Sequence, residues 1–197
     1  MQDNKKTKKI PEHAKLVFSG ILHEVYHWEQ EQFDGSYKTF EALKRRDGLV
    51  VVAITKDKKF IVNFEEHPGY PDFITLPGGN AEAGQENLEG AKRELLEETG
   101  YSSDKWEQWF RNDILHYKTL EWNEEFFIAR DCEKKTEPTP EPGEKILVQL
   151  LDFEDFLKIS QEKKFRNKTL SEIIKNILES ENRESEKEKF KNFLFGE

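Results

Sequence analysis

Three carboxylates with helical spacing are the residues of this chain best suited to chemistry. Glu94, Glu97 and Glu98 stand at positions i, i+3 and i+4, so on a helix they share one face. Like charges on one face repel, and the cluster costs stability unless a cation neutralises it. Mg²⁺ takes oxygen ligands and commonly bridges protein carboxylates to substrate phosphates. The spacing therefore predicts a divalent metal site for phosphate chemistry.

The residues around the acids favour a structured helix over the competing interpretation, an ordinary solvated acidic face. Asn87 is a candidate N-cap, and Gly100 suits the left-handed position that ends a helix. Arg93 can hold a neighbouring carboxylate in place. An apolar stripe lies opposite the acids: Leu88, Ala91, Leu95 and Thr99. We expect one helix over residues 87–99.

The segment from Gly79 to Tyr101 resembles the Nudix box of the Nudix hydrolases, Gly-x5-Glu-x7-Arg-Glu-U-x-Glu-Glu-x-Gly-U, where U is apolar. Every fixed position matches except Gln85, where the box has glutamate. An amide keeps an oxygen but loses the charge, which Glu82 or Glu86 could supply. Strands with a few interspersed helices predict a mixed-sheet sandwich of the α/β or α+β class. The resemblance implies an α/β fold, a Nudix-type α/β/α sandwich with mixed β-sheets and an N-terminal β-hairpin extension.

The resemblance also implies roles for individual residues. The expected ligands of Mg²⁺ (or Mn²⁺) are Glu94, Glu97, Glu98 and the carbonyl of Gly78, with Glu98 as a principal ligand and Glu97 counted among the catalytic residues. Arg93 should brace the acids, and Gln85 should support the site.

The general base is expected outside the box. Glu144, and next Glu141, precede a late strand at the place where the resembling enzymes carry it. Glu124 or Glu125, at the start of the preceding strand, is the alternative. For each of them an ordinary loop carboxylate is the competing interpretation.

Residues 15–178 loosely resemble the ADP-ribose or nucleoside-diphosphate-sugar pyrophosphatases. A strand–Asp34-Gly35–strand unit precedes the core, and helical segments with Phe153-x-x-Phe-Leu and Lys168-Thr-Leu-x-x-Ile-Ile follow it. That group often has a Gln-Tyr-Arg-like segment supplying a substrate arginine, and this chain has Phe64-Glu-Glu-His67 there. The resemblance implies water attack on the diphosphate of a nucleotide sugar or ADP-ribose-like compound. The alternatives are a (d)NTP or dinucleoside-polyphosphate house-cleaning hydrolase and a non-catalytic nucleotide-binding domain.

Composition limits the partners and the compartment. A net charge of −9 over 197 residues argues against nucleic-acid binding through a basic surface, so a small-molecule substrate is expected. Cys132 is the single cysteine, which leaves no intrachain disulfide and suits a reducing cytoplasm. No apolar run of about 18 residues predicts a membrane span, and no apolar segment predicts a signal peptide. The N-terminal hairpin suggests, by the same resemblance, a homodimer.

The chain is expected to divide into a basic tail (1–14), the hairpin extension (15–45), the Nudix domain (46–180) and a charged tail (181–197). Apolar runs predict strands at 48–55, 59–64, 125–130 and 145–151, with a shorter piece at 114–117. Three aromatic residues could stack on a base or simply pack: Trp28, Tyr70 and Trp122.

Overall fold

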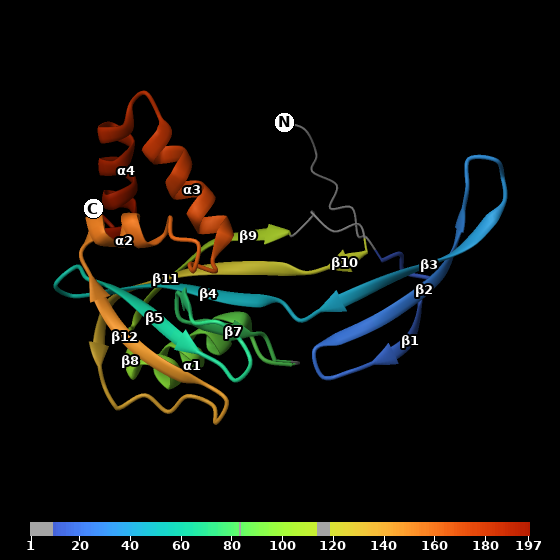
Figure 1. Ribbon diagram of the computed structural model, residues 1–197, viewed down its shortest axis with the longest axis horizontal. Coiled ribbons are helices and arrows are strands. Elements are labelled where there is room, and N and C mark those ends of the chain that lie inside the picture. The colour runs from blue at the N-terminus through green and yellow to red at the C-terminus, as the bar shows by residue number, and fades with distance from the viewer. Residues whose placement is uncertain (1–9, 83, 114–118) are drawn as a thin grey trace. The chain divides into compact units, whose positions relative to one another are not determined.

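A computed structural model describes residues 10–82, 84–113 and 119–197 of the protein (Figure 1). Most of the predicted basic tail and the whole strand piece predicted at 114–117 lie outside these residues. The chain forms two compact units. The first contains the residues up to Gly48 together with Arg111–Glu124, and the second contains Leu49–Phe110 and Glu125–Glu197.

The first unit is built on an antiparallel hairpin. Its sheet has the order β1-β2-β3-β10, with bounds Lys15–Ser19, His23–Glu31, Tyr37–Arg45 and Leu120–Glu121. Asp34 and Gly35 form the predicted turn between β2 and β3. Gly35 adopts φ 80°, and the Asp34 carboxylate accepts the Ser36 N–H at 3.0 Å. Aspartate and glycine are the residues that such turns require, which is why the hairpin was readable from sequence.

The second unit contains a sheet of order β12-β5-β4-β11-β8, with β6 beside β5, β7 beside β4 and β9 beside β11. Its strands are β4 (Gly48–Thr55), β5 (Phe60–Glu66), β6 (Phe73–Thr75), β7 (Gly78–Asn80), β8 (Tyr101–Ser102), β9 (Lys105–Asp113), β11 (Asn123–Lys134) and β12 (Lys145–Leu151). Its helices are α1 (Asn87–Thr99), α2 (Phe153–Ile159), α3 (Lys168–Glu179) and α4 (Arg183–Phe195). Strands β4, β9 and β11 each have one end among the residues of the first unit.

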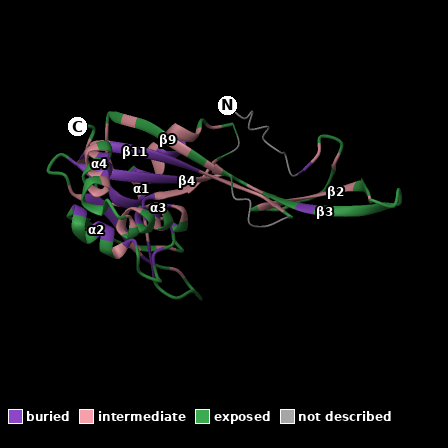
Figure 2. Ribbon diagram, turned by 90° about the horizontal axis from the view of Figure 1, so that it is seen from above, coloured by how far each residue is buried: buried purple, intermediate pink, exposed green. Residues whose placement is uncertain are grey.

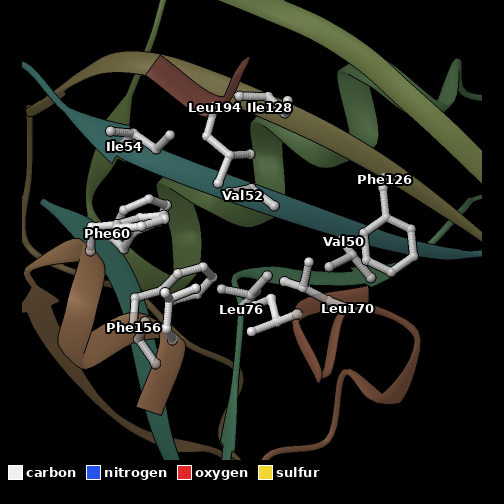
Figure 3. Close-up of a cluster of buried hydrophobic side chains, with 14 of the residues drawn as sticks. Val50, Val52, Ile54, Phe60, Leu76, Phe126, Ile128, Phe156, Leu170 and Leu194 are labelled. Atoms are coloured by element: carbon white, nitrogen blue, oxygen red, sulfur yellow. The ribbon is translucent and has the colours of Figure 1, made fainter. Parts of the chain in front are cut away.

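Both faces of this sheet are covered, so its central strands carry buried apolar residues on both faces. In β4, alternate residues pack into two different clusters because successive side chains point to opposite faces. One cluster includes Ala91 and Leu95 of α1. The other, drawn in part in Figure 3, includes Phe156 of α2, with Leu170 and Leu194 from α3 and α4. The second unit is therefore the predicted α/β/α sandwich, with its burial concentrated in the central strands (Figure 2).

The units divide the chain differently from the expected boundaries at two places. Residues 111–124 belong with the N-terminal hairpin. Residues 181–197 include helix α4, whose Phe190 and Leu194 are buried against the sheet. Phe190 and Leu194 stand four residues apart and so lie on the same side of the helix. This side packs into the core, whereas the first turns of the helix are charged. No helix among the described residues is long and apolar enough to cross a membrane.

Candidate functional site

Helix α1 runs from Asn87 to Thr99, as the sequence predicts. Gly100 ends it in the left-handed conformation, with φ 72° and its N–H donating to the Leu96 carbonyl at 2.8 Å. The prediction of Asn87 as N-cap is wrong. Glu86 occupies the N-cap position in an extended conformation. The Asn87 amide instead donates to Oε2 of Glu125 at 2.5 Å and so ties the first turn to strand β11.

Glu98 is the buried carboxylate of the acid cluster, only 7% exposed. Its Oε2 accepts two hydrogen bonds, from Asn63 Nδ2 at 2.8 Å and from the Gly78 N–H at 3.0 Å. Burial raises the pKa of Glu98 well above its usual value, and the Glu65 carboxylate is the next largest cause. The two donors do not offset this excess of negative charge, so the position favours a bound cation.

Arg93 braces the other two acids of the cluster. Its Nη2 lies 2.8 Å from Glu94 Oε1, and its Nη1 lies 2.7 Å from Glu97 Oε2. The same Nη2 lies 3.2 Å from Glu82, one of the two acids that could supply the charge missing at position 85. Burial still raises the pKa of Glu94, although Arg93 opposes that rise. One guanidinium thus serves three carboxylates and cannot neutralise them all.

The glycines before the helix let the acids approach the backbone. A Cβ atom built on Gly79 would lie 2.4 Å from Oε1 of Glu94, so a larger residue here would displace this carboxylate. Gly78 contributes its N–H to Glu98. The sequence predicted its carbonyl as a ligand, and the structure adds that the same residue holds Glu98 from the other side of the peptide.

Of the two loop glutamates, Glu144 is electrostatically coupled to the acid cluster. Its carboxylate raises the pKa of both Glu94 and Glu98. Burial raises the pKa of Glu144 itself. Glu141 is exposed, and its N–H lies 3.4 Å from Oε2 of Glu144. Glu144 is therefore the less exposed of the two loop glutamates and the one coupled to the acid cluster.

Glu125 lies at the opposite end of α1 from Glu98. Its carboxylate accepts the amides of Asn87 and Gln108. Asn87 and Glu98 are eleven positions apart, which corresponds to about 16 Å along a helix. Glu125 also lines a cavity of about 390 Å³ whose lining includes none of the box acids. Among the described contacts, Glu125 thus lies with the first turn of α1 and away from Glu98.

Gln85, the one mismatch in the box, lines that same cavity. Its Oε1 is buried without a hydrogen-bond partner and lies 3.3 Å from a Cβ built on Gly90. The side chain is therefore packed at the start of α1, and its described contacts include no carboxylate of the cluster.

Strand β5 carries two site residues that the sequence analysis did not identify, Asn63 and Glu65. Asn63 is fully buried and Glu65 is 7% exposed. A signal existed, because polar residues interrupt an otherwise apolar central strand and buried polar groups need a reason.

The donor set fits a hard divalent cation. Carboxylate oxygens are the ligands that Mg²⁺ and Mn²⁺ prefer. Burial and neighbouring carboxylates raise the pKa values of Glu94, Glu98 and Glu144. Within the described residues, no three His, Cys, Asp or Glu side chains are already gathered as a ligand set.

Of the three aromatic residues considered for base stacking, two pack against neighbouring side chains and one is exposed. Trp28 contacts Phe40, with ring centroids 5.9 Å apart, and the guanidinium of Arg45 lies 4.6 Å from the centroid of the Trp122 ring. Both pairs belong to the first unit. Tyr70 is 68% exposed in the loop after β5.

Comparison with known proteins gives three findings. The family model described as NUDIX domain matches residues 44–173. The chain is 33% identical over 90 residues to the ADP-ribose pyrophosphatase of Bacillus subtilis (strain 168), covering 45% of this chain and 49% of that protein. It is 27% identical over 133 residues to the methanol dehydrogenase activator of Bacillus methanolicus, covering 62% and 66%. The matches thus span about half and just under two thirds of these relatives.

One solved structure has a similar fold. The crystal structure of an ADP compounds hydrolase superposes with a TM-score of 0.62 at 18% identity, covering 87% of this chain and 95% of that one. At this identity the likeness concerns the fold alone.

Proposed function

We propose that this chain, which belongs to the Nudix family, is a Mg²⁺- or Mn²⁺-dependent pyrophosphohydrolase acting on a nucleoside-diphosphate derivative. The observation that carries the proposal is the environment of Glu98. A carboxylate that is 7% exposed, fixed by two donors and surrounded by further acids is stable only if something positive binds it.

Glu94, Glu97 and Glu98 would hold the cation, with the carbonyl of Gly78 as a further oxygen ligand. When bound, the ion supplies charge neutralisation for the diphosphate and polarises its phosphoryl oxygens. Arg93 keeps two of these acids at fixed positions and so presents them to the ion. Outer contacts of this kind typically contribute about 10–100-fold to metal affinity or activity.

Glu144 would accept the proton of the attacking water. The water oxygen bonds to one phosphorus, the bridging P–O bond breaks, and the proton passes to the carboxylate. Burial raises the pKa of Glu144, which makes this carboxylate a stronger proton acceptor than an exposed one. Glu141 is the second choice because it is exposed.

The proposed substrate is an ADP-ribose-like compound or a nucleotide sugar. The B. subtilis relative is named for ADP-ribose, which supports an ADP-ribose-like or nucleotide-sugar substrate. Glu65 stands in the segment where resembling enzymes often carry a substrate arginine, so this chain would recognise the distal group differently. Nucleoside triphosphates and dinucleoside polyphosphates are the competing substrates.

The test is hydrolysis of a substrate panel by the full chain with Mg²⁺ or Mn²⁺. We expect mononucleotide release from ADP-ribose or a nucleotide sugar, and a loss of about 10²–10⁴-fold in kcat for Glu144→Gln. Glu141→Gln is the matched control and should retain most of the rate. Turnover of triphosphates alone would replace the proposed substrate class. Tight nucleotide binding without turnover of any panel member would favour a binding domain.

We also propose a homodimer and a reducing, cytoplasmic location. The first unit exposes apolar side chains on β1 and in the turn that follows it, Phe18 at 60% and Ile21 at 88%, which a second copy would cover. Cys132 is buried and free, as suits a reducing compartment. Light scattering reporting a monomer at micromolar concentration would exclude the dimer.

A further inference from the structure

The face of strand β5 that packs against helix α1 becomes polar towards the end of the strand. Ile61 packs with Ala91 and Leu95 of that helix. Side chains two positions apart point the same way on a strand, so Asn63 and Glu65 continue this face. The hydrogen bond from Asn63 to Glu98 of α1 confirms the direction.

Asn63 is fully buried and only half satisfied. Its Nδ2 donates to Glu98, while its Oδ1 has no partner among the described residues. A buried amide oxygen without a donor costs about 1–3 kcal/mol, so the position needs a compensating role. Both described donors to Glu98, Asn63 and the Gly78 N–H, bind Oε2. They leave Oε1 as the oxygen available to a ligand.

Glu65 contacts a hydroxyl group and an imidazole ring. Its Oε1 accepts the Thr75 hydroxyl, and its Oε2 lies 3.1 Å from Nε2 of His67. In the described part of the chain, neither Glu65 nor Glu98 has a lysine or arginine partner. A carboxylate oxygen has two lone pairs, so these contacts leave Glu65 able to bind a further group.

Strand pairing brings Glu65 beside the loop that carries Glu144. Glu65 lies opposite Ile146, and Glu144 immediately precedes β12. Asn63 stands two positions before Glu65 on the same face and donates to Glu98 of α1. This face of the strand therefore borders the acid cluster of the helix.

The box itself lacks one acid. Gln85 stands where the pattern has glutamate, and its side chain is packed at the first turn of α1, with Gly90 and the cavity lined by Glu125. The box therefore offers three acids on the helix, Glu94, Glu97 and Glu98. Strand β5 offers Glu65 as a further carboxylate.

We propose that Glu65 is a further carboxylate ligand of the cation site, supplied by β5 in place of the acid that the box lacks, with Asn63 as the residue that positions Glu98. The inference rests on the proposed function, because it assigns additional residues to the same cation. The site would then be formed by side chains from both helix α1 and strand β5.

The test measures Mn²⁺ binding by electron paramagnetic resonance on the full chain without substrate. We expect Glu65→Gln, which keeps the shape of the side chain, to weaken Mn²⁺ binding at least tenfold. Glu125→Gln is the matched control, since Glu125 is equally buried at 7% exposure but lies at the other end of α1. Adding Gln85→Glu to Glu65→Gln should not restore the affinity, because that side chain is packed elsewhere.

Asn63→Leu tests the positioning role. We expect it to weaken Mn²⁺ binding about 10–100-fold, as for other contacts that orient a ligand. Asn167→Leu is its control, because Asn167 is also buried but its side chain accepts the Leu76 N–H at 2.8 Å and contacts none of the acids. Asn167→Leu should lower the thermal midpoint without changing the affinity.

Three results would overturn the inference. Mn²⁺ affinity within twofold of wild type in Glu65→Gln would remove Glu65 from the site. An equal loss in Glu125→Gln would show a general effect of buried charge. Wild-type protein that binds no Mn²⁺ would remove both the inference and the cation requirement of the proposed function, whereas wild-type binding with an unaffected Glu65→Gln variant would remove the inference alone.

Discussion

Replacing Glu98 with glutamine should stabilise the metal-free protein while abolishing metal-dependent activity. The side chain is 7% exposed, and a glutamine oxygen can still accept from Asn63 and Gly78. The variant therefore keeps the shape and the hydrogen bonds and removes only the charge. Relief of a buried, incompletely compensated polar group is worth about 1–3 kcal/mol. At roughly 2–4 °C per kcal/mol for a chain of this size, we expect a midpoint increase of about 2–12 °C.

The gain should depend on pH in one direction. The pKa of Glu98 in the folded protein is raised well above the usual value of 4.5. The native state therefore holds this proton more tightly than the unfolded state, and ionising Glu98 destabilises the fold. Below pH 4 both states are protonated and the cost is absent. It grows as pH rises above 4.5 and is complete once pH exceeds the folded-state pKa.

The assay is thermal unfolding in EDTA at pH 4 and pH 8 for wild type and Glu98→Gln. The expected difference in midpoint is small at pH 4 and largest at pH 8. Adding Mg²⁺ at pH 8 should raise the midpoint of the wild type and leave that of the variant almost unchanged. A variant that is less stable than wild type at pH 8 in EDTA would refute the argument that Glu98 is a strained, uncompensated charge.

Three further predictions follow from the same geometry. Arg93→Ala should reduce kcat/KM about 10–100-fold with a smaller effect on unfolding, measured by kinetics and calorimetry together. Gly79→Ala should reduce activity at least tenfold, because its Cβ would lie 2.4 Å from the Glu94 carboxylate, whereas Gly143→Ala, with open space around the Cβ, should match wild type in the same assay. Phe156→Ala, at a side chain with no exposure, should lower the free energy of unfolding by about 3–5 kcal/mol in denaturant titration.

The sequence predicted those elements whose residues have strong local conformational preferences. Helix α1 was predicted to the residue, because Gly100 requires a left-handed conformation and an apolar stripe sets the helical period. The hairpin turn at Asp34-Gly35 was equally readable. The prediction of Asn87 as the N-cap was wrong. The amide of Asn87 donates to Glu125, which is 38 positions away, and no local pattern indicates this partner.

Long-range pairing explains what the sequence did not reveal about the site. The polar residues of β5 signal a special position, but only the pairing of β5 with β12 and its contact with α1 show where those residues lie. Residues 181–197 were predicted as a charged tail, and the sequence left open whether the phenylalanines from Phe190 onwards dock. In the structure this segment contains helix α4, with Phe190 and Leu194 packed in the core of the second unit.

The central claim is that water attacks a diphosphate phosphorus with the help of a cation held by Glu98 and its neighbours. Hydrolysis of ADP-ribose and nucleotide sugars in ¹⁸O-labelled water, followed by mass spectrometry of the products, tests it most directly. The account predicts a mononucleotide and a sugar phosphate, one of them carrying a single ¹⁸O on phosphorus, formed with Mg²⁺ or Mn²⁺ and abolished by EDTA or by Glu98→Gln. Turnover that persists in EDTA, or unlabelled phosphates in every product, would contradict it.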